Sequence, residues 1–244
     1  MSVPPKYPRV PHVAPSPAAT SDDVVLSAAH RSALLSLEVV VEEKLDGMNV
    51  VVWIDGGIPR VGTRGGADTS DRSGERGRLR QWVSMHADEL AGGLGSDLVL
   101  YGEWLRRRHA VPYLRLPADL VAVDVLDRSA QRFLGVDDRD RLLARIGVPG
   151  PPKRFREALR SLERLDSLFG RSAFADARAE GLVIRTADGS DPRIAKHVDP
   201  AWSRIGEAPW AGANRLAPAT SGMLERATTK SRRERVHVRD TFGE

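Results

Sequence analysis

The chain has 244 residues, which is enough for one large globular domain or a domain with a small appendage. With 41% hydrophobic and 29% charged residues, its composition is too apolar for a disordered chain. Lysine and arginine outnumber aspartate and glutamate by 37 to 33, so a polyanionic partner is compatible with the charge without being required by it. The sequence has no cysteine, which excludes disulfide bonds, thiolate zinc sites and cysteine nucleophiles. Because it shows neither an apolar N-terminal segment nor an apolar run of about 20 residues, we expect a cytoplasmic protein without a secretory signal or a membrane contact.

The first part of the chain predicts an arm, a short helix and three strands. Residues 1–20 are rich in proline and alanine, which is typical of an extended arm. Thr20 or Ser21 is expected to cap a helix over residues 22–35. Strands are expected over residues 37–43, 48–55 and 58–63, with turns at Asp46-Gly47 and Gly56-Gly57.

The rest of the chain predicts an alternation of helices and strands. A helix with Trp82 in the core is expected to end at Gly92-Gly93, and a short helix that begins near Asp137 is stopped by glycine and proline. Residues 154–179 are arginine-rich and are expected to be helical. The remaining strands are expected over residues 97–105, 119–127, 180–186 and 193–198. The hairpin turns favour an α+β domain of antiparallel strands with helices outside, and they argue against a doubly wound parallel sheet.

Lys44 stands out because it ends an apolar, β-branched run, a place where lysine is rare. A structural interpretation is that its stem covers apolar surface while its ammonium pairs with Asp46 or Glu43. A chemical interpretation is that the amine is a covalent nucleophile, which requires burial or a nearby cation to lower its pKa. The residues next to Lys44 leave both interpretations open.

Further polar segments lie at the edges of the predicted strands. In chain order, with the segment around Lys44, they are "EKLDG" at 43–47, "TRGG" at 63–66, "YGEWL" at 101–105, "VAVDVLD" at 121–127, "EGLVIRT" at 180–186 and "IAKHV" at 194–198. Their order resembles the boxes of the covalent nucleotidyltransferases, the superfamily of polynucleotide ligases and mRNA-capping guanylyltransferases. The resemblance spans residues 7 to 204 and favours the chemical interpretation of Lys44.

Other features resemble one branch of that superfamily. The segment "KLDGMN" is similar to the K-x-x-G-x-N form of phage-type RNA ligases, and the arm and "YGEWLRRRHAVPYLRLP" resemble their bacterial members. About 46 residues follow Val198, too few for the OB domain of DNA ligases and capping enzymes. The resemblance therefore implies an extended arm over residues 1–20, an adenylyltransferase domain of antiparallel sheets flanked by helices over 21–207, and a short basic tail over 208–244 without an OB domain.

The activity implied is that of an ATP-dependent RNA ligase. It would join 5′-phosphate and 3′-hydroxyl RNA ends through AMP bound covalently to Lys44 and then through an adenylylated RNA 5′ end. ATP and Mg²⁺ or Mn²⁺ would be the cofactors, and a kinase or phosphatase that heals RNA ends is a candidate partner. The alternatives are a DNA or nick ligase core of the same superfamily and a nucleic-acid-binding module that keeps the fold without turnover.

The resemblance also implies roles for charged residues of these boxes. Lys196 would hold the α-phosphate and, as a like charge, lower the pKa of Lys44. Glu180 would bind the divalent metal directly or through water. Glu103 would accept hydrogen bonds from the ribose hydroxyls or orient a metal-bound water.

Other residues of the boxes would contact the nucleotide. Arg64 would bind phosphate or ribose, and Asn49 would lie near the phosphates and the RNA end, unless it is only a turn residue. Glu43 would meet the adenine amine mainly through its backbone carbonyl. Asp46 would orient Lys44 or a metal-bound water.

The sequence departs from the family pattern at two places. Val123 stands where a phenylalanine often packs on adenine, so an aliphatic contact would replace ring stacking. The fifth box has one lysine, Lys196, and in a strand His197 would point to the opposite face. The residues His12, His109 and Tyr113 resemble family positions without an assigned role, and His12 either contacts RNA or packs the arm. The run Arg106–Arg108 is either a solvated loop or a contact for the RNA backbone.

Overall fold

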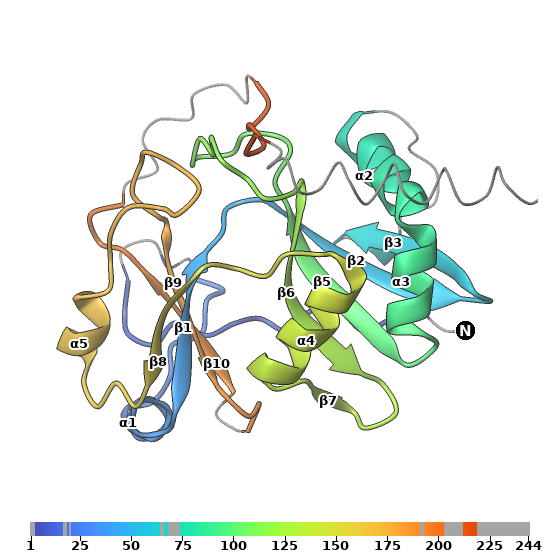
Figure 1. Cartoon of the computed structure of the whole chain (residues 1–244). Helices are drawn as coiled ribbons and strands as arrows, with labels where there is room; N and C mark the ends of the chain where they lie inside the picture. Colours follow the sequence, from blue (N-terminus) through green and yellow to red (C-terminus); the bar gives the residue numbers. More distant parts are fainter. Residues whose placement is uncertain are drawn as a thin grey trace, which may run out of the picture.

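The computed structural model describes residues 3–16, 19, 21–63, 66–67, 74–190, 193–202 and 212–218. Two antiparallel sheets form the frame of these residues, with helices packed outside them (Figure 1). The smaller sheet has four strands in the order β10-β9-β1-β8, and the larger has six in the order β4-β3-β2-β5-β6-β7. The expected α+β class, with antiparallel sheets flanked by helices, is confirmed.

The strands of the smaller sheet are β1 (Val39–Lys44), β8 (Lys153–Glu157), β9 (Gly181–Thr186) and β10 (Ile194–Val198). Those of the larger sheet are β2 (Met48–Asp55), β3 (Ile58–Thr63), β4 (Gly66–Ala67), β5 (Leu98–Trp104), β6 (Leu120–Asp127) and β7 (Arg132–Phe133). The helices are α1 (Ala28–Ser36), α2 (Gly74–Met85), α3 (Ala87–Leu94), α4 (Val136–Ile146) and α5 (Leu162–Asp166).

Each sheet has its own hydrophobic core. Helices α2, α3 and α4 cover one face of the larger sheet, where Trp82 and Trp104 are buried together with valines and leucines of β2, β5 and β6. Helices α1 and α5 lie beside the smaller sheet and bury Leu34 and Leu165 against Val39. The expected place of Trp82 in the core is confirmed. The other face of the larger sheet carries a smaller apolar cluster of Trp53, Val99, Tyr101 and Leu126, against which Tyr7 of the arm packs.

The segment that follows Lys44 carries the chain from one sheet to the other. Lys44 ends β1 in the smaller sheet, and β2 begins at Met48 in the larger. The predicted Asp46-Gly47 turn is therefore a crossover between sheets and not a hairpin. A Cβ atom on Gly47 would lie 2.8 Å from the Trp104 carbonyl oxygen, so a glycine is required for this close approach.

The structure corrects three of the predicted helices. Residues 154–179 do not form one helix, because residues 153–157 pair with β1 as strand β8 and only Leu162–Asp166 is helical. The first helix begins after Ser27, which caps it, because the backbone of residues 24–26 bonds to His12 of the arm. The helix around Trp82 is divided at His86.

Helix α3, which follows the division at His86, runs past the predicted stop at Gly92-Gly93 and ends at Leu94. Gly93 lies inside α3, where a Cβ atom would come within 1.9 Å of Ile146 Cγ2. Gly93 therefore allows α3 to pack closely on α4, and Gly95, with φ of +54°, is the residue that ends the helix.

The N-terminal arm lies along the smaller sheet. The backbone N–H of Lys196 donates to Pro11 at 2.8 Å, and the N–H of Val13 donates back to the Lys196 carbonyl at 2.9 Å. On its other side, the N–H of His12 donates to the Val24 carbonyl at 2.7 Å. The arm is thus held by backbone hydrogen bonds beside β10.

The part of the predicted tail that the structure describes, residues 212–218, lies against the loop that follows β5. Asn214 accepts a hydrogen bond from the Tyr113 N–H at 3.0 Å and donates to the Leu105 carbonyl at 2.6 Å. Most of the predicted tail over 208–244 is outside the described residues, as is Arg64. Among the described residues, no helix has the length and apolar character needed to span a membrane.

Candidate active site

A cavity of about 370 Å³ lies between the two sheets. Strand β1 and the crossover supply one part of its wall, strands β2, β5 and β6 another, and β9, β10 and the arm close it. The predicted site residues that line it are Glu43, Lys44, Asp46, Asn49, Glu103, Val123, Glu180 and Lys196. All the predicted site residues that the structure describes therefore meet in one cavity.

Lys44 and Glu180 form an ion pair inside this cavity. The Lys44 Nζ lies 2.5 Å from the Glu180 Oε2, and the two side chains are 25% and 13% exposed. Register explains the pairing, because Lys44 faces Gly181 in the β1–β9 ladder. Burial acts to lower the pKa of Lys44, but the charge and hydrogen bond of Glu180 outweigh it, so that this pKa is raised. Lys44 is therefore an ammonium ion here.

Glu103 has a perturbed carboxyl group on the opposite wall. Burial raises its pKa to about 7, against the opposing effects of the Lys44 charge and a hydrogen bond from Asn49. Its Oε2 atom is buried without a hydrogen-bond partner. A buried, unpaired carboxylate oxygen is suited to a cation or to a ligand hydroxyl.

The carboxylates fit a divalent metal that keeps most of its water. No cluster of three or more histidine, aspartate or glutamate ligands occurs among the residues whose positions are described. Glu103 and Glu180 nevertheless face the same cavity. Mg²⁺ binds through one or two carboxylates together with waters and phosphate oxygens, so this pair is a suitable set of protein ligands.

Lys196 enters the cavity from β10 and has an acidic partner. Its Nζ lies 2.6 Å from the Asp23 Oδ1. The other oxygen of Asp23 lies 3.7 Å from the His12 Nε2. His197, the next residue, points to the opposite face, as expected, where it meets Asp166 and Phe169.

Asp46 holds the loop that follows β5. Its Oδ2 accepts hydrogen bonds from the N–H groups of Ala110 at 2.7 Å and Val111 at 3.2 Å. Its own N–H donates to the Tyr113 hydroxyl at 2.8 Å, and His109 lies 3.8 Å from its Oδ1. Tyr113 and His109 thus gain a structural role that the sequence did not give them.

The Glu43 side chain faces away from Lys44. Its carboxylate bonds to Arg154 at 3.1 Å, to the Ala173 N–H at 2.8 Å and to the Ser172 hydroxyl. Because these three partners occupy its carboxylate, only the backbone of Glu43 remains available to a ligand.

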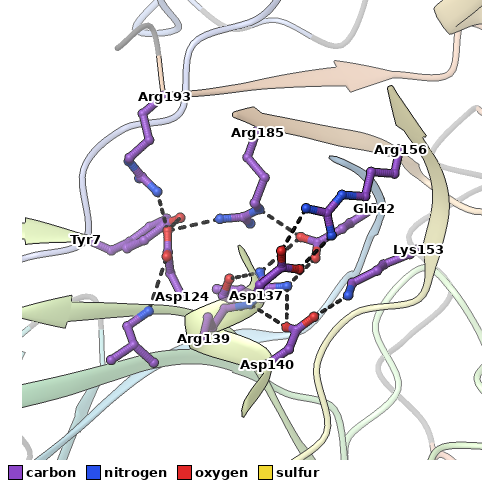
Figure 2. Close-up of polar contacts among 12 residues, drawn as sticks. Tyr7, Glu42, Asp124, Asp137, Arg139, Asp140, Lys153, Arg156, Arg185 and Arg193 are labelled. Carbon is purple, nitrogen blue, oxygen red and sulfur yellow. Dashed lines mark hydrogen bonds and ion pairs between the residues drawn. The ribbon is translucent and has the colours of Figure 1, made fainter. Parts of the chain in front are cut away.

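A chain of buried charges joins the two sheets beside the cavity, and Figure 2 shows it. Glu42, on β1, bonds to Arg139 of α4 and, at 2.8 Å, to Arg185 of β9. Asp124, on β6, bonds to Arg185 at 3.1 Å and to Arg193 at 2.5 Å. The Tyr7 hydroxyl also donates to Asp124, at 2.9 Å, which fixes the arm to the same cluster.

A model of the RNA ligase family matches residues 37–198, more than half of the chain. The chain belongs to the RNA ligase family. The match begins just before β1 and ends with β10, so it covers both sheets and every described residue of the candidate site except those of the arm. No curated protein matches the sequence.

Solved structures of RNA ligases have a similar fold. The RNA ligase of Naegleria gruberi with PPi aligns with a TM-score of 0.59 and 20% identity over 70% of this chain and 52% of the other. A mutant of that ligase with ATP and Mn aligns with a TM-score of 0.58 and 20% identity over 68% of this chain and 51% of the other. Another mutant of that ligase, with AMP and Mn, aligns with a TM-score of 0.59 and 20% identity over 69% of this chain and 52% of the other. This RNA ligase family member thus spans about half the length of these structures.

Sequence reasoning missed the buried charges and the packing of the arm beside β10. Single charged residues inside apolar strands, such as Glu42, Asp124 and Arg185, are a signal of buried ion pairs, because such residues are rarely buried alone. No comparable signal marks Asp23 or His12, whose positions depend on how the arm packs beside β10.

Proposed function

We propose that this RNA ligase family member is an ATP-dependent RNA ligase whose nucleophile is Lys44. It would join RNA 5′-phosphate and 3′-hydroxyl ends in three steps, through AMP on Lys44 and an adenylylated RNA 5′ end. The proposal depends on one observation: the amine of Lys44 lies inside a cavity, 2.5 Å from Glu180, and Lys196 lines the same cavity. In this proposal Arg64, Asn49 and Val123 contact the nucleotide in the ways that the resemblance implies.

The first step requires a change of protonation at Lys44. Its raised pKa keeps the amine protonated at neutral pH, and an ammonium ion is no nucleophile. The proton must pass to solvent and the contact with Glu180 must weaken before attack. Then an N–P bond forms to the α-phosphorus of ATP, the α–β P–O bond breaks, and pyrophosphate leaves with that electron pair while the amine loses its second proton.

Charges on the cavity wall support this step. The ammonium of Lys196 can leave Asp23 and bind the α-phosphate of ATP, because the phosphate, like the carboxylate, offers it an anionic oxygen. Mg²⁺ or Mn²⁺, when bound, would supply positive charge that neutralises the phosphates and the two carboxylates. Glu103 and Glu180 would hold this cation, and Glu180 would then no longer keep the pKa of Lys44 high.

Intact mass after mixing with ATP and Mg²⁺ tests the reaction class. We expect one added AMP in the wild type, none in Lys44→Ala, and the full addition in Lys153→Ala, since Lys153 pairs with Asp140 away from the cavity. Absence of the adduct in the wild type would favour the non-catalytic binding module. An adduct from GTP alone would point to capping chemistry.

Ligation of matched substrates tests the choice of nucleic acid. RNA, DNA and hybrid nicks with a 5′-phosphate and a 3′-hydroxyl should be offered side by side with ATP. We expect sealing of RNA ends, and sealing of DNA nicks alone would overturn the RNA assignment in favour of a DNA ligase core.

A further inference from the structure

A second cavity continues the candidate active site toward the N-terminal arm. Its volume is about 850 Å³, and it shares Lys44, Glu180 and Lys196 with the first cavity. The arm residues on its wall are Lys6, Tyr7, Pro8, Arg9, Val10 and His12. Since the two cavities meet at Lys44 and Lys196, a ligand bound at these lysines can extend from one cavity into the other.

The arm is a built wall of this cavity. Tyr7 packs its ring 5.0 Å from that of Tyr101 and donates its hydroxyl to Asp124. The Tyr101 hydroxyl donates to the Pro5 carbonyl at 2.7 Å. Together with the backbone hydrogen bonds that His12 donates to Val24 and accepts from Leu26, these contacts fix both ends of the segment from residue 6 to residue 12.

Four cations line the second cavity, since Lys6 and Arg9 of the arm join Lys44 and Lys196 on its wall. Three carboxylates line it as well and pair with three of these cations: Asp22 with Arg9, Asp23 with Lys196 and Glu180 with Lys44. Arg9 donates to the Asp22 carbonyl at 2.6 Å and lies 3.7 Å from the Asp22 carboxylate, at the protein surface. A polyphosphate can displace such surface carboxylates, because a bound phosphate offers several anionic oxygens at once.

His12 adds a buried hydrogen-bonding group. The side chain is 2% exposed, lines the cavity, and neither ring nitrogen has a hydrogen-bond partner among the described residues. Its contact with Asp23 at 3.7 Å is longer than a hydrogen bond. Burial and the charge of Lys196 lower its pKa, so the ring is neutral near pH 7 and carries one N–H donor. A buried donor without an acceptor fits an anionic ligand.

Resting on the proposed function, we propose that the arm, through Lys6, Arg9 and His12, holds the β- and γ-phosphates of ATP and then the leaving pyrophosphate. An in-line displacement places the leaving group opposite the attacking nitrogen. With the adenosine in the cavity between the sheets and the α-phosphate at Lys44 and Lys196, the chain of phosphates continues into the second cavity.

The test compares ATP with AMP, because AMP lacks the two phosphates assigned to the arm. Binding is measured by calorimetry with Mg²⁺ in a Lys44→Ala background, which prevents turnover. Adding Lys6→Ala and Arg9→Ala should weaken ATP binding by about tenfold or more, as expected for loss of charge-assisted contacts, and leave AMP binding within about twofold. Arg141→Ala, a charge loss on the exposed surface of α4, should change neither.

His12 is tested by two substitutions whose folding is checked by thermal unfolding. His12→Gln keeps an N–H donor and should retain part of the ATP affinity, whereas His12→Leu should lose it while still binding AMP. If both bind ATP as the parent does, His12 is not a phosphate ligand.

The outcomes separate this inference from the proposed function. Equal ATP affinity in the parent and in the Lys6→Ala/Arg9→Ala variant overturns the inference, even if the wild type forms its AMP adduct. If the same two substitutions, made with Lys44 intact, slow only the transfer of AMP to RNA, the arm binds the RNA 5′-phosphate and the inference is also overturned. A loss of ATP affinity in a protein that never forms the adduct would uphold the inference and refute the ligase proposal.

Discussion

The Glu42 carboxylate is expected to contribute more to stability than any exposed ion pair of this protein. It is fully buried and accepts hydrogen bonds from Arg139 and, at 2.8 Å, from Arg185. Glu42→Gln keeps the shape of the side chain but removes the charge that these two buried guanidinium groups share (Figure 2). Breaking a buried ion pair from one side destabilises a protein by about 3–5 kcal/mol, and we expect a loss in this range.

Urea unfolding at neutral pH, followed by tryptophan fluorescence, measures this loss. The matched control is Asp138→Asn, because Asp138 pairs with Arg141 on the surface, where the two side chains are 59% and 77% exposed. An exposed pair contributes under about 1 kcal/mol. Adding Arg139→Met to Glu42→Gln should restore part of the stability, since it removes one of the uncompensated cations. If Glu42→Gln and Asp138→Asn lower the free energy of unfolding equally, the buried carboxylate contributes no more than an exposed one, and the expectation is wrong.

Three further perturbations address the candidate site. Gly47→Ala should abolish formation of the AMP adduct and lower the denaturation midpoint, because the new Cβ would lie 2.6 Å from Leu105 Cδ2 and 2.8 Å from a backbone oxygen; an unchanged adduct rate would contradict this. The pKa of Glu103, raised to about 7 by burial, means that the folded protein binds more protons than the unfolded chain below that pH, so stability should fall as pH rises from 4.5 toward 7. When the free energy of unfolding is measured across pH, Glu103→Gln should depend on pH less than the wild type does. The same pH dependence in both proteins would contradict a raised pKa of Glu103. Asn214→Ala should slow adduct formation several-fold by releasing Tyr113, which supports Asp46, whereas normal kinetics with a lowered melting temperature would make Asn214 purely structural.

Local patterns predicted most of the strands and the order of the site segments. Alternating or β-branched runs placed the strands that carry Lys44 and Glu103 and the strand that begins just after Glu180. The helix expected over residues 154–179 was wrong because its arginines do not serve one helix face. Arg154 bonds to Glu43 and Arg156 to Asp137, and both lie on a strand that pairs with β1.

The sequence alone singled out the residues of the candidate site, because Lys44, Glu180 and Lys196 each lie in a short segment at the edge of a predicted strand. Their protonation states and their neighbours depend on the tertiary structure. The pairing of Lys44 with Glu180, the raised pKa of Glu103 and the arm that reaches Lys196 all arise from packing two sheets together. Burial and charge act through space over a few ångströms, and residues 6–12 and 196 become neighbours only when the chain is folded.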